Sequence, residues 1–252
     1  MSPQDQLSSM KSLFERSGFH LRQDQIDRFR EYYRLIMEYN EECDLTRLVR
    51  FEDIVVKHFI DCMCPSRIIS LPSPLLDVGT GAGFPGIPMK ILDPALSLVL
   101  AEPRRRRVGF LENVVRALGL DNVEIYPHLV GPHSRFEVDG VVTRALEQVD
   151  DTLRRVMHFL GEGGRVVFMK GPGASRDLDG LSEEMRAEYE CVHDAEYTLP
   201  ETAHLRRLLV YRKLRSTSAV TYMIFRGQGE NAENVITSHD NGRFREMKRI
   251  SA

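Results

Sequence analysis

The stretch LLDVGTGAGFPGIPMKI, residues 75–91, decides the fold. It begins as a short apolar run, passes through closely spaced glycines and ends in a segment with the pattern of a helix. Glycine adopts positive φ and carries no side chain, so a glycine-rich turn between a strand and a helix lets a ligand approach the main chain. No GxxxxGKS/T motif is present, which argues against an ATP site of the Walker type. The turn predicts a nucleotide-type site, although many α/β folds need such a turn for packing alone.

Two acidic residues sharpen this prediction. Asp77 lies in the strand just before the turn, where its carboxylate either accepts hydrogen bonds from the loop amides or meets a cationic ligand. Glu102 ends the next predicted strand, nineteen residues after Gly83. A carboxylate at that position can accept hydrogen bonds from both ribose hydroxyls of an adenosine-containing ligand. The alternative for Glu102 is an exposed strand-end carboxylate paired with the arginines that follow it.

NAD and S-adenosylmethionine both satisfy this geometry. The pyrophosphate of NAD favours GxGxxG with the third glycine inside the helix. Here the run is DVGTGAGFPG, residues 77–86, in which the glycines alternate. This spacing better fits a ligand without phosphates, whose methionine end lies against the turn.

Outward from this stretch, short apolar strands alternate with amphipathic helices, which predicts an α/β protein with a mostly parallel, doubly wound sheet. Little more than LPETAH separates the last two strands, so we expect an antiparallel hairpin at the sheet edge. The predicted strands are Leu75–Val78, Leu96–Ala101, Val123–Tyr126, Gly140–Thr143, Arg165–Lys170, Tyr189–Tyr197 and Leu205–Arg212. The predicted helices are Gly86–Leu92, Arg104–Leu118, Gln148–Leu160 and Ser175–Glu188.

Three parts are expected along the chain. Residues 1–65 show apolar residues at helical spacing, with a helix starting at Ser2-Pro3 and stopping at Gly18. A stretch rich in proline and serine near residues 65–74 predicts the boundary with the sheet domain, 66–214. Residues 215–252 are polar and end in a basic segment, which predicts a disordered basic tail.

Composition limits the function classes. The net charge of −3 over 252 residues predicts that any nucleic-acid contact uses a local basic patch such as Arg104–Arg107. No apolar run is long enough to span a membrane, and the first residues lack the apolar core of a signal peptide. We therefore expect a cytoplasmic protein without membrane contact. The four cysteines lack the spacing of a zinc site, and no metal is expected.

The loop LLDVGTGAGFPGIP closely resembles that of the bacterial small-subunit rRNA guanine-N7 methyltransferases, also called glucose-inhibited division protein B. Its FPGIP continuation is much more specific than the glycines. Segments similar to the family follow its order at EYNEECDLT, VVKHFIDCM, RRVGFLENVVRALGLDNVEI, VVTRAL and GEGGRVVFMKG. The resemblance covers about residues 20–214.

The resemblance implies a Rossmann-like, seven-stranded class I S-adenosylmethionine-dependent methyltransferase fold with an N-terminal helical region. It implies S-adenosylmethionine as the methyl donor and a guanine of 16S rRNA, free or in the small ribosomal subunit, as the acceptor at N7. Guanine N7 already carries a lone pair, so we expect in-line orientation of the reactants and no catalytic acid or base. A monomer is expected.

Carried over position by position, the resemblance assigns the methionine side of the cofactor to the glycine loop and the ribose to Glu102. It places Arg144, in VVTRAL, against the cofactor or the target base; the alternative is a strand-end arginine held in a salt bridge. His58 lies in VVKHFIDCM, where a role toward the substrate competes with a structural one. The implied cofactor-binding residues are Gly79, Gly81, Gly83, Phe84, Glu102, Val130, Gly131 and Arg144.

One departure from the family concerns adenine. After the third strand the family carries a small residue followed by an acid, whereas HLVGPH gives Val130-Gly131 without an acid. The backbone here can still contact adenine, but the acceptor for its amino group is missing, and one lost hydrogen bond costs about 1 kcal/mol. This departure leaves open a catalytically reduced RNA- or nucleotide-binding protein that retains the fold. A small-molecule methyltransferase is a third reading, since a fold does not determine a substrate.

A second resemblance lies in the basic tail. VITSHDNGRFREMKRI is similar to the opening of the SpoU-type ribose methyltransferases, with Gly242 where proline is expected. The rest of such an enzyme does not follow in this sequence, so we expect no knotted methyltransferase domain from these residues.

Overall fold

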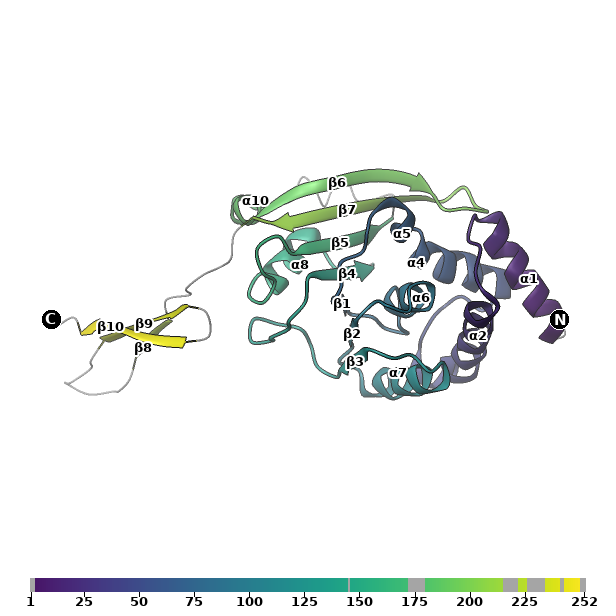
Figure 1. Ribbon diagram of the computed structural model, residues 1–252, viewed down its shortest axis with the longest axis horizontal. Helices are drawn as coiled ribbons and strands as arrows, with labels where there is room; N and C mark the ends of the chain where they lie inside the picture. The colour runs from purple at the N-terminus through teal and green to yellow at the C-terminus, as the bar shows by residue number, and fades with distance from the viewer. Residues whose placement is uncertain are drawn as a thin grey trace. The chain divides into compact units, whose positions relative to one another are not determined.

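The computed structural model describes residues 3–144, 146–171, 180–214, 222–225, 234–240 and 243–249. The chain divides into two compact units, Met1–Leu214 and Arg215–Ala252. The first contains a seven-stranded sheet in the order β3-β2-β1-β4-β5-β7-β6 (Figure 1). Strands β1 to β5 pair in parallel, and β7 lies antiparallel between β5 and β6. The predicted α/β class, the seven strands and the antiparallel edge hairpin are confirmed.

The bounds of the elements follow the sequence closely. The strands are β1 Leu75–Val78, β2 Leu98–Ala101, β3 Val123–Tyr126, β4 Gly140–Arg144, β5 Arg165–Lys170, β6 Tyr189–Thr198 and β7 Leu205–Lys213. The helices of this unit are α1 Pro3–Arg16, α2 Gln23–Cys43, α3 Phe51–Ile54, the π-helix η1 Val55–Ile60, α4 Asp61–Met63, α5 Pro65–Ile68, α6 Gly86–Leu92, α7 Arg105–Ala117, α8 Val149–Val156 and α10 Glu183–Glu188.

Two predicted bounds differ from the structure at places where a buried lysine binds a backbone carbonyl. β2 begins at Leu98 and not at Leu96, and the carbonyl of Leu96 accepts a hydrogen bond from Lys90 Nζ at 2.6 Å. α8 ends at Val156 and not at Leu160, whose carbonyl accepts one from Lys213 Nζ at 2.9 Å. Both ammonium groups are buried and satisfied by carbonyl oxygens, as buried polar groups must be.

Side chains of the central strands alternate between two apolar cores. Leu75 and Val142 enter one core with the N-terminal helices, α6 and α7. Leu76 and Val141 enter the other with α8 and α10. Both faces of the central sheet are therefore covered, which is why these strands read as continuous apolar runs.

The N-terminal helices pack beside α6 and α7 in the same unit as the sheet (Figure 1). The predicted stop at Gly18 is confirmed, since α1 ends two residues before Gly18, whose φ is +80°, whereas the predicted cap Ser2 lies outside the described residues. Tyr32, buried on α2, donates from its hydroxyl to the carbonyl of Ala82 at 2.5 Å. The helical region therefore contacts the glycine-rich turn directly.

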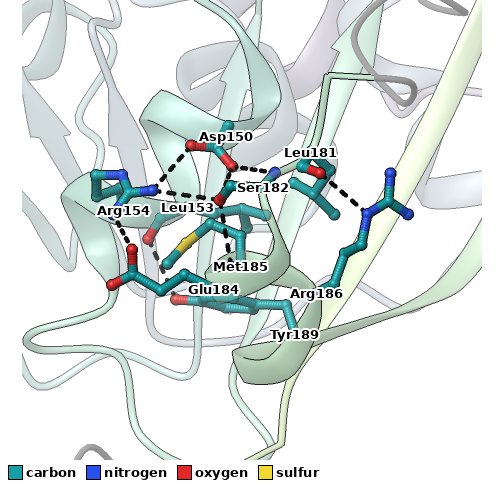
Figure 2. Close-up of polar contacts among 9 residues, drawn as sticks. All are labelled: Asp150, Leu153, Arg154, Leu181, Ser182, Glu184, Met185, Arg186 and Tyr189. Carbon is teal, nitrogen blue, oxygen red and sulfur yellow. Dashed lines mark hydrogen bonds and ion pairs between the residues drawn. The ribbon is translucent and has the colours of Figure 1, made fainter.

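A short helix covers the other face of the sheet. The predicted helix Ser175–Glu188 is described only from residue 180, and its helical part is α10. Ser182 caps α10, and Asp150 of α8 accepts hydrogen bonds from the Ser182 amide and hydroxyl at 2.8 and 2.6 Å (Figure 2). This contact fixes α10 against α8.

In the second unit, the described residues form three antiparallel strands in the order β10-β9-β8. They are β8 Tyr222–Phe225, β9 Asn234–Asp240 and β10 Arg243–Arg249. The sequence predicted disorder for residues 215–252, but the run Val235–Thr237 is β-branched and favours a strand. The SpoU-like segment covers most of β9 and all of β10, while its residues Asn241, Gly242 and Ile250 lie outside the described part of the chain.

Candidate active site

The glycine-rich turn between β1 and α6 has the backbone geometry that the sequence predicted. Gly79, Gly81 and Gly83 have φ of +70°, +62° and +98°. Such values are costly for residues with a side chain. The amides of Gly79 and Thr80 donate to the Ala101 carbonyl at 3.0 and 3.1 Å, which ties the turn to the end of β2.

Asp77, in β1, anchors this turn. Its buried Oδ2 accepts hydrogen bonds from Thr80 Oγ1 at 2.6 Å and from the Gly86 amide at 2.7 Å. Burial raises the pKa of this carboxyl to about 7. Of the two sequence interpretations, the structure therefore shows the loop anchor.

Glu102 lies directly after β2 and is only 4% exposed. Its Oε2 accepts from the Gly81 amide at 3.1 Å and its Oε1 from the Arg104 amide at 2.9 Å. The alternative of an exposed carboxylate paired with arginine side chains is wrong, because the carboxylate is buried and its bond to Arg104 is made with the backbone. Glu102 joins the glycine turn to the start of α7.

A pocket of about 210 Å³ opens at the carboxyl ends of β1, β2 and β3. Ligands of open α/β sheets bind at this edge, where the strand order reverses. Of the residues predicted to bind cofactor, Gly79, Glu102 and Val130 line the pocket together, while Gly131 follows Val130 in the chain. The lining residues are Val78, Gly79, Ala101, Glu102, Pro103, Arg104, Arg107, His128, Leu129, Val130, Leu146 and Arg155.

Phe84 and Arg144 belong to a different cluster. The ring of Phe84 stacks on His58 with centroids 4.5 Å apart, and Arg144 Cζ lies 5.9 Å from the Phe84 centroid. Arg144 Nη2 is 3.1 Å from Asp61 Oδ2 and donates to the Lys57 carbonyl at 2.6 Å. The contacts of Arg144 are thus those of a salt-bridged strand-end residue that joins β4 to the N-terminal helices.

His58 is bonded on both ring nitrogens. Its Nε2 lies 2.7 Å from Thr46 Oγ1 and its Nδ1 lies 3.3 Å from Arg144 Nη1. Burial, with the charge of Arg144, lowers the pKa of His58 to about 3, so the ring is neutral at neutral pH. Its contacts hold the cluster together.

Two members of this cluster were missed by sequence reasoning. Asp61 is buried and faces both Arg144 and Arg206, whose Nε lies 3.0 Å from Asp61 Oδ1. Asp61 lies in VVKHFIDCM, so the family-like segment was the available signal. No local pattern marks Arg206, which reaches Asp61 only through the fold.

Comparison with known proteins identifies the family. Residues 25–205 match the family model described as rRNA small subunit methyltransferase G. The chain belongs to this family. It is 40% identical over 208 residues to ribosomal RNA small subunit methyltransferase G 2 of Bdellovibrio bacteriovorus, covering 82% of each chain. It is 34% identical over 219 residues to ribosomal RNA small subunit methyltransferase G of Carboxydothermus hydrogenoformans, covering 83% of this chain and 92% of the relative.

Solved structures confirm the fold. A mutant of MtNAS, solved in complex with S-adenosylmethionine, matches with a TM-score of 0.53 at 13% identity, covering 82% of this chain and 84% of that one. Membership of the methyltransferase G family confirms the expected enzyme class, an rRNA methyltransferase, and the structural match confirms the expected Rossmann-like α/β fold. In the described ranges, no group of three or more His, Cys, Asp or Glu side chains is placed to hold a metal ion, and no helix is long and apolar enough to cross a membrane.

The glycine turn of this methyltransferase yields a stability prediction. A Cβ on Gly83 would lie 2.7 Å from Tyr32 Oη and would overlap Ile87 Cδ1, whereas a Cβ on Gly81 has no neighbour closer than 3.7 Å. We expect Gly83→Ala to lower the free energy of unfolding by about 2–4 kcal/mol, from backbone strain and overpacking together. Gly81→Ala is the matched control and should cost about 1 kcal/mol, from strain alone. Urea denaturation measures both, and equal losses would show that the Tyr32 contact is not tight.

Proposed function

We propose that this protein transfers the methyl group of S-adenosylmethionine to N7 of a guanine in 16S rRNA. Membership of the methyltransferase G family over residues 25–205 carries the proposal. The residues of the pocket fit the cofactor: Gly79, from the turn with three positive-φ glycines, and the buried carboxylate of Glu102 line it together with apolar side chains such as Leu129 and Val130. The cofactor supplies an electrophilic methyl group.

In this proposal the chain binds and orients the reactants. Guanine N7 has a lone pair in the plane of the base, so no proton has to leave before attack. Phe84 connects the glycine turn to His58 and Arg144, and we propose that this cluster orients the target base beside the turn. His58 is neutral and bonded on both ring nitrogens, which suits a positioning role and not proton transfer.

The rRNA would be held by arginines at the mouth of the pocket. Arg106 and Arg107 already bind the protein backbone, because their guanidinium groups donate hydrogen bonds to the carbonyls of Glu42 and Cys43 at the end of α2. Arg104 and Arg105 are exposed, and neither side chain has a polar partner within the described part of the chain. Two of the four arginines therefore remain for phosphate groups, and binding through them should weaken as salt rises.

The test is methyl transfer from labelled S-adenosylmethionine to naked 16S rRNA, to assembled 30S particles and to a pool of metabolites. We expect label in the RNA as 7-methylguanine, identified by chain cleavage after borohydride and aniline, and less transfer at higher salt. Label in the metabolite pool alone would favour the small-molecule methyltransferase. Cofactor binding without any transfer would favour the non-catalytic RNA- or nucleotide-binding protein. We further propose that the enzyme acts in the cytoplasm and that it is a monomer. Sedimentation of the purified chain tests the oligomeric state.

A further inference from the structure

Arg155 lines the pocket next to Val130, close to the position where the family's acid is missing. It projects from α8 and lines the pocket together with His128, Leu129 and Val130. Its Nη1 donates to the carbonyl of Val130 at 2.9 Å. The guanidinium therefore lies beside the backbone that leads into Gly131, the position at which an acid would otherwise stand.

Glu147 holds this guanidinium in one orientation. Arg155 Nε and Nη2 lie 2.8 and 2.7 Å from the two carboxylate oxygens of Glu147, and Thr152 Oγ1 donates to the same carboxylate at 3.2 Å. Paired bonds of this kind fix both the plane and the position of a guanidinium. Together with the bond to Val130 they use three of its five N–H groups. One N–H on Nη1 and one on Nη2 remain.

The chemistry of these two groups differs from that of an acid. A carboxylate accepts a hydrogen bond from the amino group of adenine, whereas a guanidinium can only donate and binds ring nitrogens or carbonyl oxygens. We propose that Arg155, held by Glu147, replaces the missing acid and donates hydrogen bonds to acceptor atoms of the cofactor's purine. The amino group of adenine then makes no hydrogen bond that the protein uses for recognition. This inference rests on the proposed use of the pocket for S-adenosylmethionine.

A changed selectivity for the base follows. Hypoxanthine carries a carbonyl oxygen beside the acceptor N7, the pair of atoms that a guanidinium binds with two hydrogen bonds in guanine. Adenine offers a single acceptor on the same edge. The protein should therefore bind S-inosylhomocysteine at least as tightly as S-adenosylhomocysteine, which a site that reads the amino group would not do.

The experiment is calorimetric titration of the full chain with these two ligands. Wild type is expected to bind both, with Kd for the inosine ligand equal to or below that for the adenosine ligand. Arg155→Met should weaken the adenosine ligand about tenfold and the inosine ligand more strongly, because it loses two bonds. Arg154→Met is the matched control: its guanidinium pairs with Asp150 and Glu184 (Figure 2), it does not line the pocket, and both affinities should stay unchanged.

A second variant distinguishes recognition of the purine base by Arg155 from a purely structural role of this residue. A Cβ on Gly131 has no neighbour within 4 Å, so a side chain can start from this position without a clash. Adding Gly131→Asp to Arg155→Met should make the adenosine ligand bind about tenfold more tightly than the inosine ligand, a reversal that bracing of the loop alone would not produce. Two results would overturn the inference alone: adenosine preferred tenfold by wild type, or Arg155→Met leaving both affinities unchanged. Absence of adenosine-ligand binding by wild type would overturn the proposed cofactor site as well.

Discussion

Replacing Glu102 with alanine is expected to weaken binding of S-adenosylhomocysteine by about a hundredfold or more. The carboxylate lines the pocket at the end of β2, where it can accept hydrogen bonds from both ribose hydroxyls. A hydrogen bond to a charged group contributes about 1.5–3 kcal/mol, so the loss of two exceeds a hundredfold in Kd. Calorimetric titration of wild type and variant measures the change. Glu112→Ala, an exposed glutamate on α7, is the control and should bind as wild type does.

The same carboxylate also accepts from the amides of Gly81 and Arg104, so a weaker Kd alone would not prove a contact with ribose. Titration with the 2′,3′-dideoxy analogue of S-adenosylhomocysteine separates the two roles. Wild type should discriminate against this analogue by about a hundredfold, and Glu102→Ala should bind both ligands with equal affinity. If the alanine variant still discriminates, Glu102 anchors the turn and another group holds the ribose. Glu102→Gln is no neutral replacement, because its NH₂ group would face a backbone N–H donor.

The sheet and the cofactor turn could be predicted because their signals are local. β1, β3 and β5 have the predicted bounds, since each is a short stretch rich in apolar residues between turn or loop residues. The turn itself is marked by its glycines, and Glu102 by its distance along the chain from Gly83. Both signals lie within about thirty residues, inside one strand–turn–helix–strand unit.

The rest of the site depends on contacts between distant segments. Arg144 was assigned either to the ligand or to a salt bridge, and only the fold shows its partner Asp61, on a helix before the sheet begins. Arg155 carried no sequence signal, because Val130, which follows β3, and helix α8, which follows β4, come together only through the arrangement of the strands in the sheet. The end of α8 was misplaced at Leu160, whose carbonyl binds the distant Lys213, whereas the start of β2 was misplaced at Leu96, whose carbonyl binds the nearby Lys90.

The loss of Asp61 should have the largest effect on stability. Its carboxylate is buried between two guanidinium groups, at 3.1 Å from Arg144 and 3.0 Å from Arg206. Asp61→Asn keeps the size of the side chain but leaves two largely buried cations without a counter-charge. Breaking a buried ion pair from one side costs about 3–5 kcal/mol, and we expect a loss of this size in the free energy of unfolding. Urea denaturation measures it. Asp53→Asn removes the partly exposed partner of Lys57 and should change the unfolding free energy little.

The position of Asp61 predicts that activity and cofactor affinity separate in this variant. Asp61 joins the N-terminal helices to the end of β4 and the start of β7, whereas the pocket lies over β1, β2 and β3 and is not lined by it. Below its unfolding midpoint, Asp61→Asn should bind S-adenosylhomocysteine within about threefold of wild type, while methyl transfer to rRNA falls at least tenfold because Arg144 loses its position. Equal losses of affinity and transfer would mean that the variant has lost the fold of the pocket. Unchanged transfer would exclude the Phe84, His58 and Arg144 cluster from orienting the base.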